Sequence, residues 1–228
     1  WSVARYHPEQ PRNVRDGPRA LRSLARLWGL LDLGPSEQRQ VDLGNALLRT
    51  QILFMLLALA YRFAALMEHP ARAHWQPLAP SSWLLPELRH LASLDGVDAV
   101  YLDQCTTGAP WRKPTTLMAV NLPALRLEIS SLPGAGRCCP ALGHRHVSLG
   151  GKAEDGSWMT APAKTYPRGL CQALARALHR RALDVLAAHS GCPPESVQPE
   201  ADLLGLVVPV DWYDPASWEA FTHDCVTA

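Results

Sequence analysis

A group of cysteines and histidines in the second half of the chain could hold a metal ion. The segment reads Cys138-Cys139-Pro-Ala-Leu-Gly-His144-Arg-His146. Thiolate sulfur and imidazole nitrogen are usual zinc ligands, and one of the two cysteines with both histidines would supply three of the four that zinc needs. Cys105 or Cys171 could complete the tetrahedral set. The spacing fits no common zinc-finger pattern, and the alternative is an ordinary loop with buried thiols.

Two cations lie on a stiff loop in the middle of the chain. Arg112 and Lys113 stand between Pro110 and Pro114, and each proline fixes φ and prevents regular structure. The loop follows an apolar run at residues 98–103 that predicts a strand. Because α/β proteins tend to place ligand contacts at the ends of strands, the two cations are candidate ligand contacts. The alternative is a hairpin-like connection with two solvated cations.

A carboxylate ends another predicted strand, at residues 63–68, where the sequence reads Glu68-His-Pro70. At the mouth of a sheet, Glu68 could accept hydrogen bonds from the exocyclic amine or ring N–H of a bound nucleobase. The alternative is a carboxylate that caps the next turn. The sequence contains no Walker loop, Gly-x-Gly-x-x-Gly, Gly-x-Ser-x-Gly or His-Glu-x-x-His motif, so motif rules alone leave the function open.

The elements that would position these side chains alternate between helix and strand. Besides the strands, apolar periodicity predicts helices at residues 36–60, 82–94 and 168–189 and a short one around 18–28. A third strand is expected at 115–120, followed by an irregular segment to about 167. The alternation favours an α/β fold. The longest apolar run, at 52–61, is about half of what a membrane span needs, so we expect a buried helix and no span.

Charge divides the chain into three parts, although the net charge is only +1. Residues 1–35 are basic and broken by prolines, and residues 36–192 hold the predicted α/β core. Residues 193–228 form an acidic, aromatic-containing tail without Lys or Arg. A basic head and an acidic tail favour docking within the molecule or onto partners, and two solvated surfaces are the alternative.

The cysteine pattern bears on the compartment. The chain has 228 residues and six cysteines, which form no recognisable disulfide framework at this length. We therefore expect an intracellular, reducing compartment, without a distinction between nucleus and organelle. The sequence starts at Trp1-Ser2 without an initiator Met, which favours a processed product or a piece of something longer.

Several short sequence segments occur in an order that is similar to their order in a known family. They are Trp1-Ser-Val-Ala-Arg5, Leu27-Trp-Gly-Leu30, Gly44-Asn-Ala-Leu47, Glu68-His-Pro70, Leu102-Asp-Gln-Cys-(x)2-Gly-Ala-Pro-Trp-Arg-Lys-Pro-Thr115, His144-x-His146-(x)2-Leu149-(x)-Gly151 and Ala163-Lys-Thr-Tyr-Pro167-(x)3-Cys171. Over about residues 1–180 the chain resembles the C-terminal part of cytosine-C5 DNA-methyltransferase-like domains, in a divergent branch found in mobile-element-associated open reading frames.

The resemblance implies a partial Rossmann-like sheet with flanking helices, plus an irregular Cys/His segment and a C-terminal extension. It implies that Glu68 holds a flipped cytosine by its N3 and amino group, although His69 stands where the family has Asn. It also implies that Arg112 lies near the target base. The expected nucleic-acid contacts are Arg5, Arg12, Arg15 and Lys113.

The same resemblance implies that catalytic parts are missing. The glycine-rich loop for S-adenosylmethionine and the nucleophilic cysteine would precede Trp1, and no cysteine present stands at the matching position. We therefore expect a truncated or degenerate methyltransferase-like domain that is inactive alone and binds no cofactor itself. One alternative is a non-enzymatic interaction subunit that docks into a larger assembly through its basic head and acidic aromatic tail. Another is a zinc-stabilised nucleic-acid-binding module.

Overall fold

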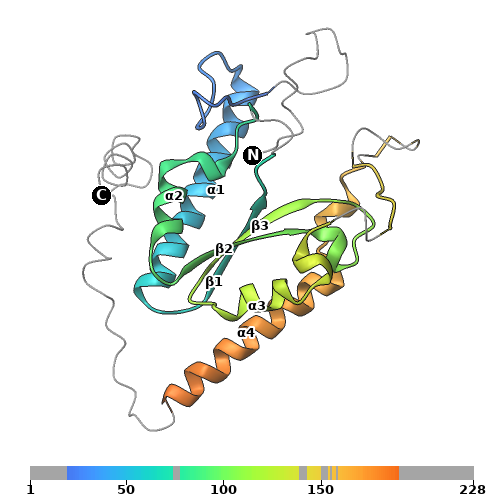
Figure 1. The fold of residues 1–228 in the computed structure, drawn as a ribbon. Helices are drawn as coiled ribbons and strands as arrows, with labels where there is room; N and C mark the ends of the chain where they lie inside the picture. The colour runs from blue at the N-terminus through green and yellow to red at the C-terminus, as the bar shows by residue number, and fades with distance from the viewer. Residues whose placement is uncertain are drawn as a thin grey trace.

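The computed structural model describes residues 20–73, 78–138, 143–149, 154, 156–157 and 159–189. In this part of the chain the longer elements follow the order α1 (Pro35–Ala60), β1 (Ala65–Pro70), α2 (Pro86–Ser93), β2 (Val97–Asp103), β3 (Pro114–Val120), α3 (Ala124–Ser130) and α4 (Arg168–His189). Short 3₁₀ turns connect them: η2 (Ser82–Leu84), η3 (Gln104–Thr107), η4 (Pro133–Gly136) and η6 (Pro162–Lys164). Figure 1 shows the arrangement.

The strands form one sheet in the order β1-β3-β2. Both pairings are antiparallel, and Leu117 in the middle strand faces Glu68 on one side and Val100 on the other. Strands β1 and β2 therefore run parallel to each other, with α2 between them in the chain and β3 inserted between them in the sheet. This arrangement is a split βαβ unit. The predicted α/β class is confirmed, whereas this small sheet alone does not confirm a Rossmann-like fold, whose sheet is mostly parallel.

Helices cover both faces of the sheet, so the core has two halves (Figure 1). On one face, α1 and α2 pack against Met67, Met118 and Val120. On the other face, α3 and α4 pack against Leu102 and Leu117. The sheet is buried on both sides, which explains why the middle strand is almost continuously apolar rather than alternating.

Helix α1 begins at Pro35, one residue before the predicted start, and its N-cap is Gly34 rather than the expected Ser36. Pro35 occupies the first turn, and the backbone N–H of Gly34 donates to Glu37 Oε2 at 3.0 Å. Its inner side chains recur at helical spacing and are buried: Val41, Leu48, Ile52, Met55 and Leu59. By length and hydropathy α1 could also cross a membrane, but the buried core helix of a soluble protein has the same properties.

Two local predictions were wrong. The expected helix near 18–28 is not present in its described part, where residues 20–28 form turns and an isolated bridge joins Ser23 to Arg26. The reason is that Arg22 turns inward, and its guanidinium donates to the carbonyls of Leu27 and Val41. The second error is α3, which was expected to be irregular. Only two apolar side chains of this short helix, Leu125 and Ile129, recur at helical spacing and are buried, so the sequence signal for a helix was weak.

Candidate metal centre

The turn after β2 fixes the first cysteine of the site. Thr106 Oγ1 donates to the carbonyl of Asp103 at 2.8 Å, and Thr107 Oγ1 donates to the carbonyl of Gln104 at 2.6 Å. These bonds tighten η3 around Cys105, whose thiol is buried. Gly108 ends the turn with φ +98°, a left-handed conformation that favours glycine.

The first turn of α4 supports η3 from outside. A Cβ on Gly169 would lie 2.6 Å from the carbonyl oxygen of Thr107, so only glycine allows this approach. The next residue, Leu170, is fully buried under β2 and β3. The turn that carries Cys105 is therefore held between the sheet and α4.

Two backbone hydrogen bonds bring the Cys/His segment to this turn. The N–H of Cys138 donates to Asp103 Oδ2 at 2.9 Å. The N–H of Val147 donates to the carbonyl of Pro110 at 2.8 Å. The Cys/His segment is thus attached at its first candidate ligand, Cys138, and just after its last one, His146. The first attachment is to the end of β2, and the second is to the loop between β2 and β3.

The result is a convergence of four ligand atoms. The Sγ atoms of Cys105 and Cys138 and a ring nitrogen each of His144 and His146 all lie within 4.8 Å of one another. Cys138 Sγ is 3.4 Å from His146 Nε2 and 3.8 Å from His144 Nε2, and the two Nε2 atoms are 2.9 Å apart. A tetrahedral zinc ion with ordinary bond lengths separates such atoms by roughly 3.3–3.8 Å. The two distances from Cys138 Sγ match this range, whereas the two Nε2 atoms are closer and the widest pair lies within 4.8 Å, so a bound ion would need small side-chain shifts to reach regular geometry.

The chemistry of the four ligands matches a structural metal site. Two sulfurs and two nitrogens close a tetrahedron and leave no position for a reactive water. Burial first, and then hydrogen bonding to Cys138 and the nearby charge of Asp103, raise the pKa of the Cys105 thiol to about 12. A bound cation would favour the thiolate, so this cysteine gains its charge together with the metal.

The structure decides between the ligands that the sequence left open. Cys105 belongs to the cluster and Cys171 does not, since the Cys171 thiol is exposed and donates to the carbonyl of Tyr166 at 3.9 Å. Cys138, His144 and His146 were all among the predicted ligands. Cys139 lies outside the described residues, as do Arg5, Arg12 and Arg15.

A buried aspartate that the sequence analysis missed organises the site. Asp103 is 1% exposed. Its Oδ1 accepts from Tyr101 Oη at 2.8 Å and from Arg112 Nε at 3.1 Å, while its Oδ2 accepts from the N–H of Cys138. The carboxylate raises the pKa of Arg112, and burial together with Asp103 raises that of Tyr101 to about 12. Its position at the end of a strand, two residues before Cys105, was the available signal.

The predicted base-contacting residues separate into two groups. Arg112 is half-exposed and pairs with Asp103. Glu68 instead lies near Lys113, with Nζ 3.6 Å from Oε1, and accepts a hydrogen bond from Tyr166 Oη at 3.2 Å. Burial and the charge of Glu68 raise the pKa of Tyr166 to about 12. Tyr166 belongs to one of the segments that carry the family resemblance, Ala163-Lys-Thr-Tyr-Pro167, but nothing in the sequence around it predicted its contact with Glu68.

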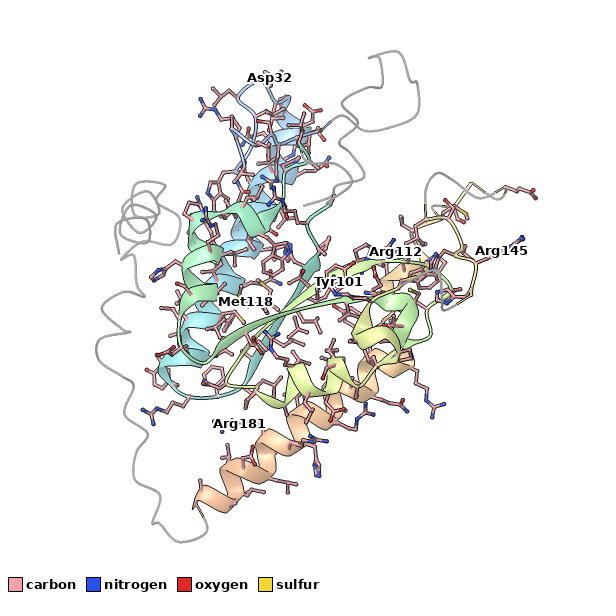
Figure 2. The ribbon with its side chains drawn as sticks, viewed as in Figure 1. Asp32, Tyr101, Arg112, Met118, Arg145 and Arg181 are labelled. Atoms are coloured by element: carbon pink, nitrogen blue, oxygen red, sulfur yellow. The ribbon has the colours of Figure 1, made fainter. Side chains whose placement is uncertain are left out.

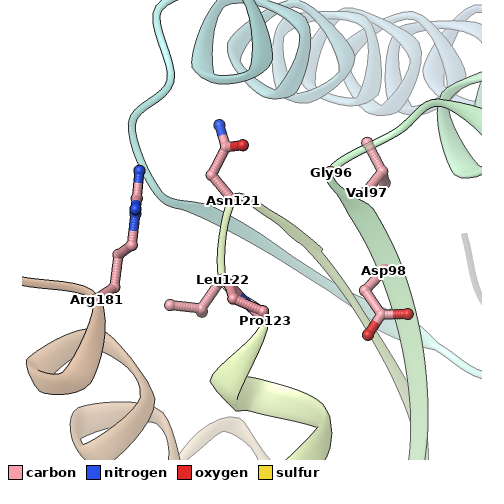
Figure 3. A pocket seen from close by; sticks show the side chains of 7 residues that line it. All are labelled: Gly96, Val97, Asp98, Asn121, Leu122, Pro123 and Arg181. Atoms are coloured by element: carbon pink, nitrogen blue, oxygen red, sulfur yellow. The ribbon is translucent and has the colours of Figure 1, made fainter. Parts of the chain in front are cut away.

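A cavity of about 420 Å³ lies at the opposite end of the sheet (Figure 3). It is lined by the start of β2, the turn after β3 and Arg181 of α4. Most of its polar groups have partners within the fold: Arg181 Nη2 donates to the carbonyl of Arg62 at 3.0 Å, and Asn121 donates to the carbonyl of Ala58 at 3.0 Å, whereas Arg181 Nε is buried without an acceptor among the described residues. Asp98 pairs with Arg126. The cavity is therefore a weaker ligand site than the metal centre.

In comparisons with known proteins, no family model, curated protein or solved structure matches the chain.

Proposed function

We propose that this chain is a zinc-stabilised nucleic-acid-binding module on an α/β sheet of methyltransferase-like descent. The observation that carries the proposal is the convergence of four suitable ligands from two separate stretches of the chain, Cys105 from one and Cys138, His144 and His146 from the other. Two thiols and two imidazoles are a usual ligand set of structural zinc sites.

The exposure of the segment explains why a metal would be needed. Residues 143–148 are all exposed, so they contribute little apolar burial that could order them. A structural zinc ion supplies binding free energy that becomes folding free energy, on the order of 10 kcal/mol in small zinc-binding peptides. The thiols of Cys105 and Cys138 are free in the structure, which suits a reducing compartment.

Nucleic acid is the ligand class that the neighbouring residues favour. The side chains of Lys113 and Glu68 are 27% and 20% exposed and lie beside each other, with Nζ 3.6 Å from Oε1. A partly exposed carboxylate beside a cation suits the amine edge of a nucleobase and an adjacent phosphate. The split βαβ unit is compatible with the end of a larger α/β sheet, since such sheets can carry an antiparallel strand. In this proposal the chain alone transfers no methyl group.

Metal content tests the proposal directly. We expect the purified chain to contain one zinc per molecule by elemental analysis, and a strong chelator to lower its melting temperature. The double variant Cys105→Ser/Cys138→Ser should contain none, whereas Cys171→Ser should match the wild type. A folded wild-type chain that lacks zinc after refolding with the metal, and whose melting temperature does not respond to the chelator, would end the zinc proposal.

A specific surface favours the alternative of an interaction subunit. Leu43, Leu47 and Phe54 lie on the outer side of α1 and are 63%, 59% and 58% exposed. Exposed apolar side chains at helical spacing are typical of a docking face. Size-exclusion chromatography of the chain with and without Phe54→Ser tests this alternative, which predicts self-association or a co-purifying partner that the substitution removes. A chain that is monomeric and partnerless in both forms contradicts it.

A further inference from the structure

We infer that the metal centre builds a phosphate-binding surface from Arg137 and Arg145, so that nucleic-acid affinity depends on the bound metal. The inference rests on the proposed function and names the surface through which it would act. The other cations near the site are already paired or lie on other elements. Arg137 and Arg145 are directly adjacent to metal ligands.

Arg145 stands between the two histidine ligands. His144 and His146 both direct Nε2 toward the cluster, and these atoms are 2.9 Å apart. Arg145 is exposed, and Figure 2 shows it projecting outward from the segment, away from the sheet. Ligation on both sides would therefore fix the backbone of Arg145 while its guanidinium remains in solvent, where a phosphate can reach it.

Arg137 immediately precedes the ligand Cys138 and is held by a different contact. Its guanidinium carbon lies 4.8 Å from the ring centre of Tyr101, within the range of a cation–π interaction. Tyr101 is fixed in turn by its hydrogen bond to Asp103. A guanidinium held on an aromatic ring can still present N–H donors at its rim, which is the geometry that suits phosphate oxygens.

Arginines near the candidate ligands differ in whether a carboxylate neutralises them. Neither Arg137 nor Arg145 has an acidic partner among the described residues. On the outer face of α4, by contrast, Arg176 and Arg180 both pair with the buried Glu128, at 2.6 and 3.0 Å. Arg112, which lies at the same end as Arg145 in Figure 2, is neutralised by Asp103. Arg137 and Arg145 therefore lie beside the candidate metal ligands without a neutralising carboxylate among the described residues, so they are available to bind an external anion.

The bound metal would determine how tightly Arg137 and Arg145 bind a phosphate group. Within residues 143–149, the backbone N–H of Val147 donates to the carbonyl of Pro110 and attaches the segment to the sheet-end loop. Coordination through His144 and His146 adds two strong attachments on either side of Arg145. A preorganised cation binds its phosphate with less loss of conformational entropy, so removal of the metal should weaken binding even though it removes no arginine.

The test measures binding of a fluorescein-labelled oligonucleotide of about 20 nucleotides, single-stranded and as a duplex, by fluorescence anisotropy at several salt concentrations. The variants are Arg145→Glu and Arg137→Gln. The control is Arg89→Glu, which makes the same charge change at an exposed position of α2, on the other face of the sheet. Zinc content and circular dichroism are measured for every variant, and the wild type is also assayed after chelation.

We expect Arg145→Glu to weaken binding at least about fivefold and to lower the slope of log affinity against log salt by about 0.7–0.9, as one lost phosphate contact does. Arg137→Gln should weaken binding less, chelation should weaken it to a similar extent as Arg145→Glu, and Arg89→Glu should leave it unchanged. These effects should occur while the zinc content of the arginine variants stays at the wild-type value.

Three results would overturn the inference. One is wild-type affinity for Arg145→Glu in a zinc-loaded protein, which leaves the zinc proposal intact. Another is an equal loss for Arg89→Glu, which shows a general charge effect. The third is competition by polyglutamate as strong as by unlabelled oligonucleotide, which assigns the surface to an acidic protein. Absence of zinc from the wild type removes the metal dependence together with the proposed function, whatever the arginine variants do.

Discussion

At the end of the sheet where β2 begins, Asp98 pairs with Arg126 and Asn121 donates to the carbonyls of Ala58 and Phe63. At the end where β2 stops, Asp103 is also paired, but four metal ligands and two arginines beside them keep capacity for external partners. The cavity end keeps one unpartnered group, the buried Arg181 Nε, whereas the other end gathers four candidate metal ligands. We therefore place the proposed site at the end where these ligands converge.

The largest expected effect comes from removing a metal ligand. Cys105→Ser should lower the free energy of unfolding by more than about 3 kcal/mol, because it removes the metal and with it a share of the folding free energy. The matched control is Cys171→Ser, an exposed cysteine outside the cluster, with a change of at most about 0.5 kcal/mol. Urea denaturation of zinc-loaded proteins measures both. Equal stability of the two variants would remove the distinction between these cysteines.

A second substitution compares the two ends of β2 directly. Asp103→Ala removes a fully buried carboxylate that three groups use, and we expect a loss of about 3 kcal/mol. Asp98→Ala removes a pair whose side chains are 33% and 61% exposed, and should cost about 0.2–1 kcal/mol. Thermal and urea unfolding of both variants give the comparison, which fails if the Asp98 variant is the less stable one.

The pH dependence of stability tests the buried environment at the end of β1. Burial lowers the pKa of His69 to about 4, and its Nδ1 lies 2.9 Å from Ser82 Oγ. His69 takes up a proton near pH 6.5 in the unfolded state and only near pH 4 in the folded state. The neutral, half-buried His69 therefore leaves the free energy of unfolding at its full value above the unfolded pKa, and this free energy falls as the pH is lowered. Between pH 7 and pH 5, the protonation of His69 in the unfolded state should lower the free energy of unfolding by about 2 kcal/mol. His69→Gln should remove this part of the slope.

Acidification also protonates metal ligands, so the His69 measurement needs a reference that shares the metal centre. The wild type and His69→Gln have the same cysteines and histidines in the cluster, and the difference between their pH profiles isolates His69. Parallel profiles for the two proteins would contradict a neutral, buried His69.

The smallest expected effect concerns the contact between β1 and Tyr166, which lies two residues before the start of α4. Tyr166→Phe removes the hydrogen bond to Glu68 and keeps the ring near Lys113. Since Tyr166 is 41% exposed, water can replace the lost partner, and we expect a cost of about 0.5–1 kcal/mol. Spectrophotometric titration of the tyrosines should also lose a component with a pKa near 12 in this variant. A titration identical to that of the wild type would exclude the assignment.

The elements with strong local patterns could be predicted from the sequence. Pro35 and Glu37 mark the start of α1, and the apolar period of α4 begins at Arg168, as predicted. These signals are local, because capping and side-chain periodicity act within a few turns. Where the local signal was short, as in α3, or where a polar side chain turned inward, as Arg22 did, the prediction failed. Packing against distant residues decided those segments.

For the site, the sequence by itself indicated that Cys138, His144 and His146 are candidate ligands on one short segment, whereas an extended chain of eight residues could still separate them by roughly 26–29 Å. Only the tertiary structure selected Cys105 rather than Cys171 as the fourth ligand, and only it paired Arg112 with Asp103 and Glu68 with Lys113. The physical reason is that these contacts depend on strand register and on the close approach of α4 at Gly169, which many distant residues fix together.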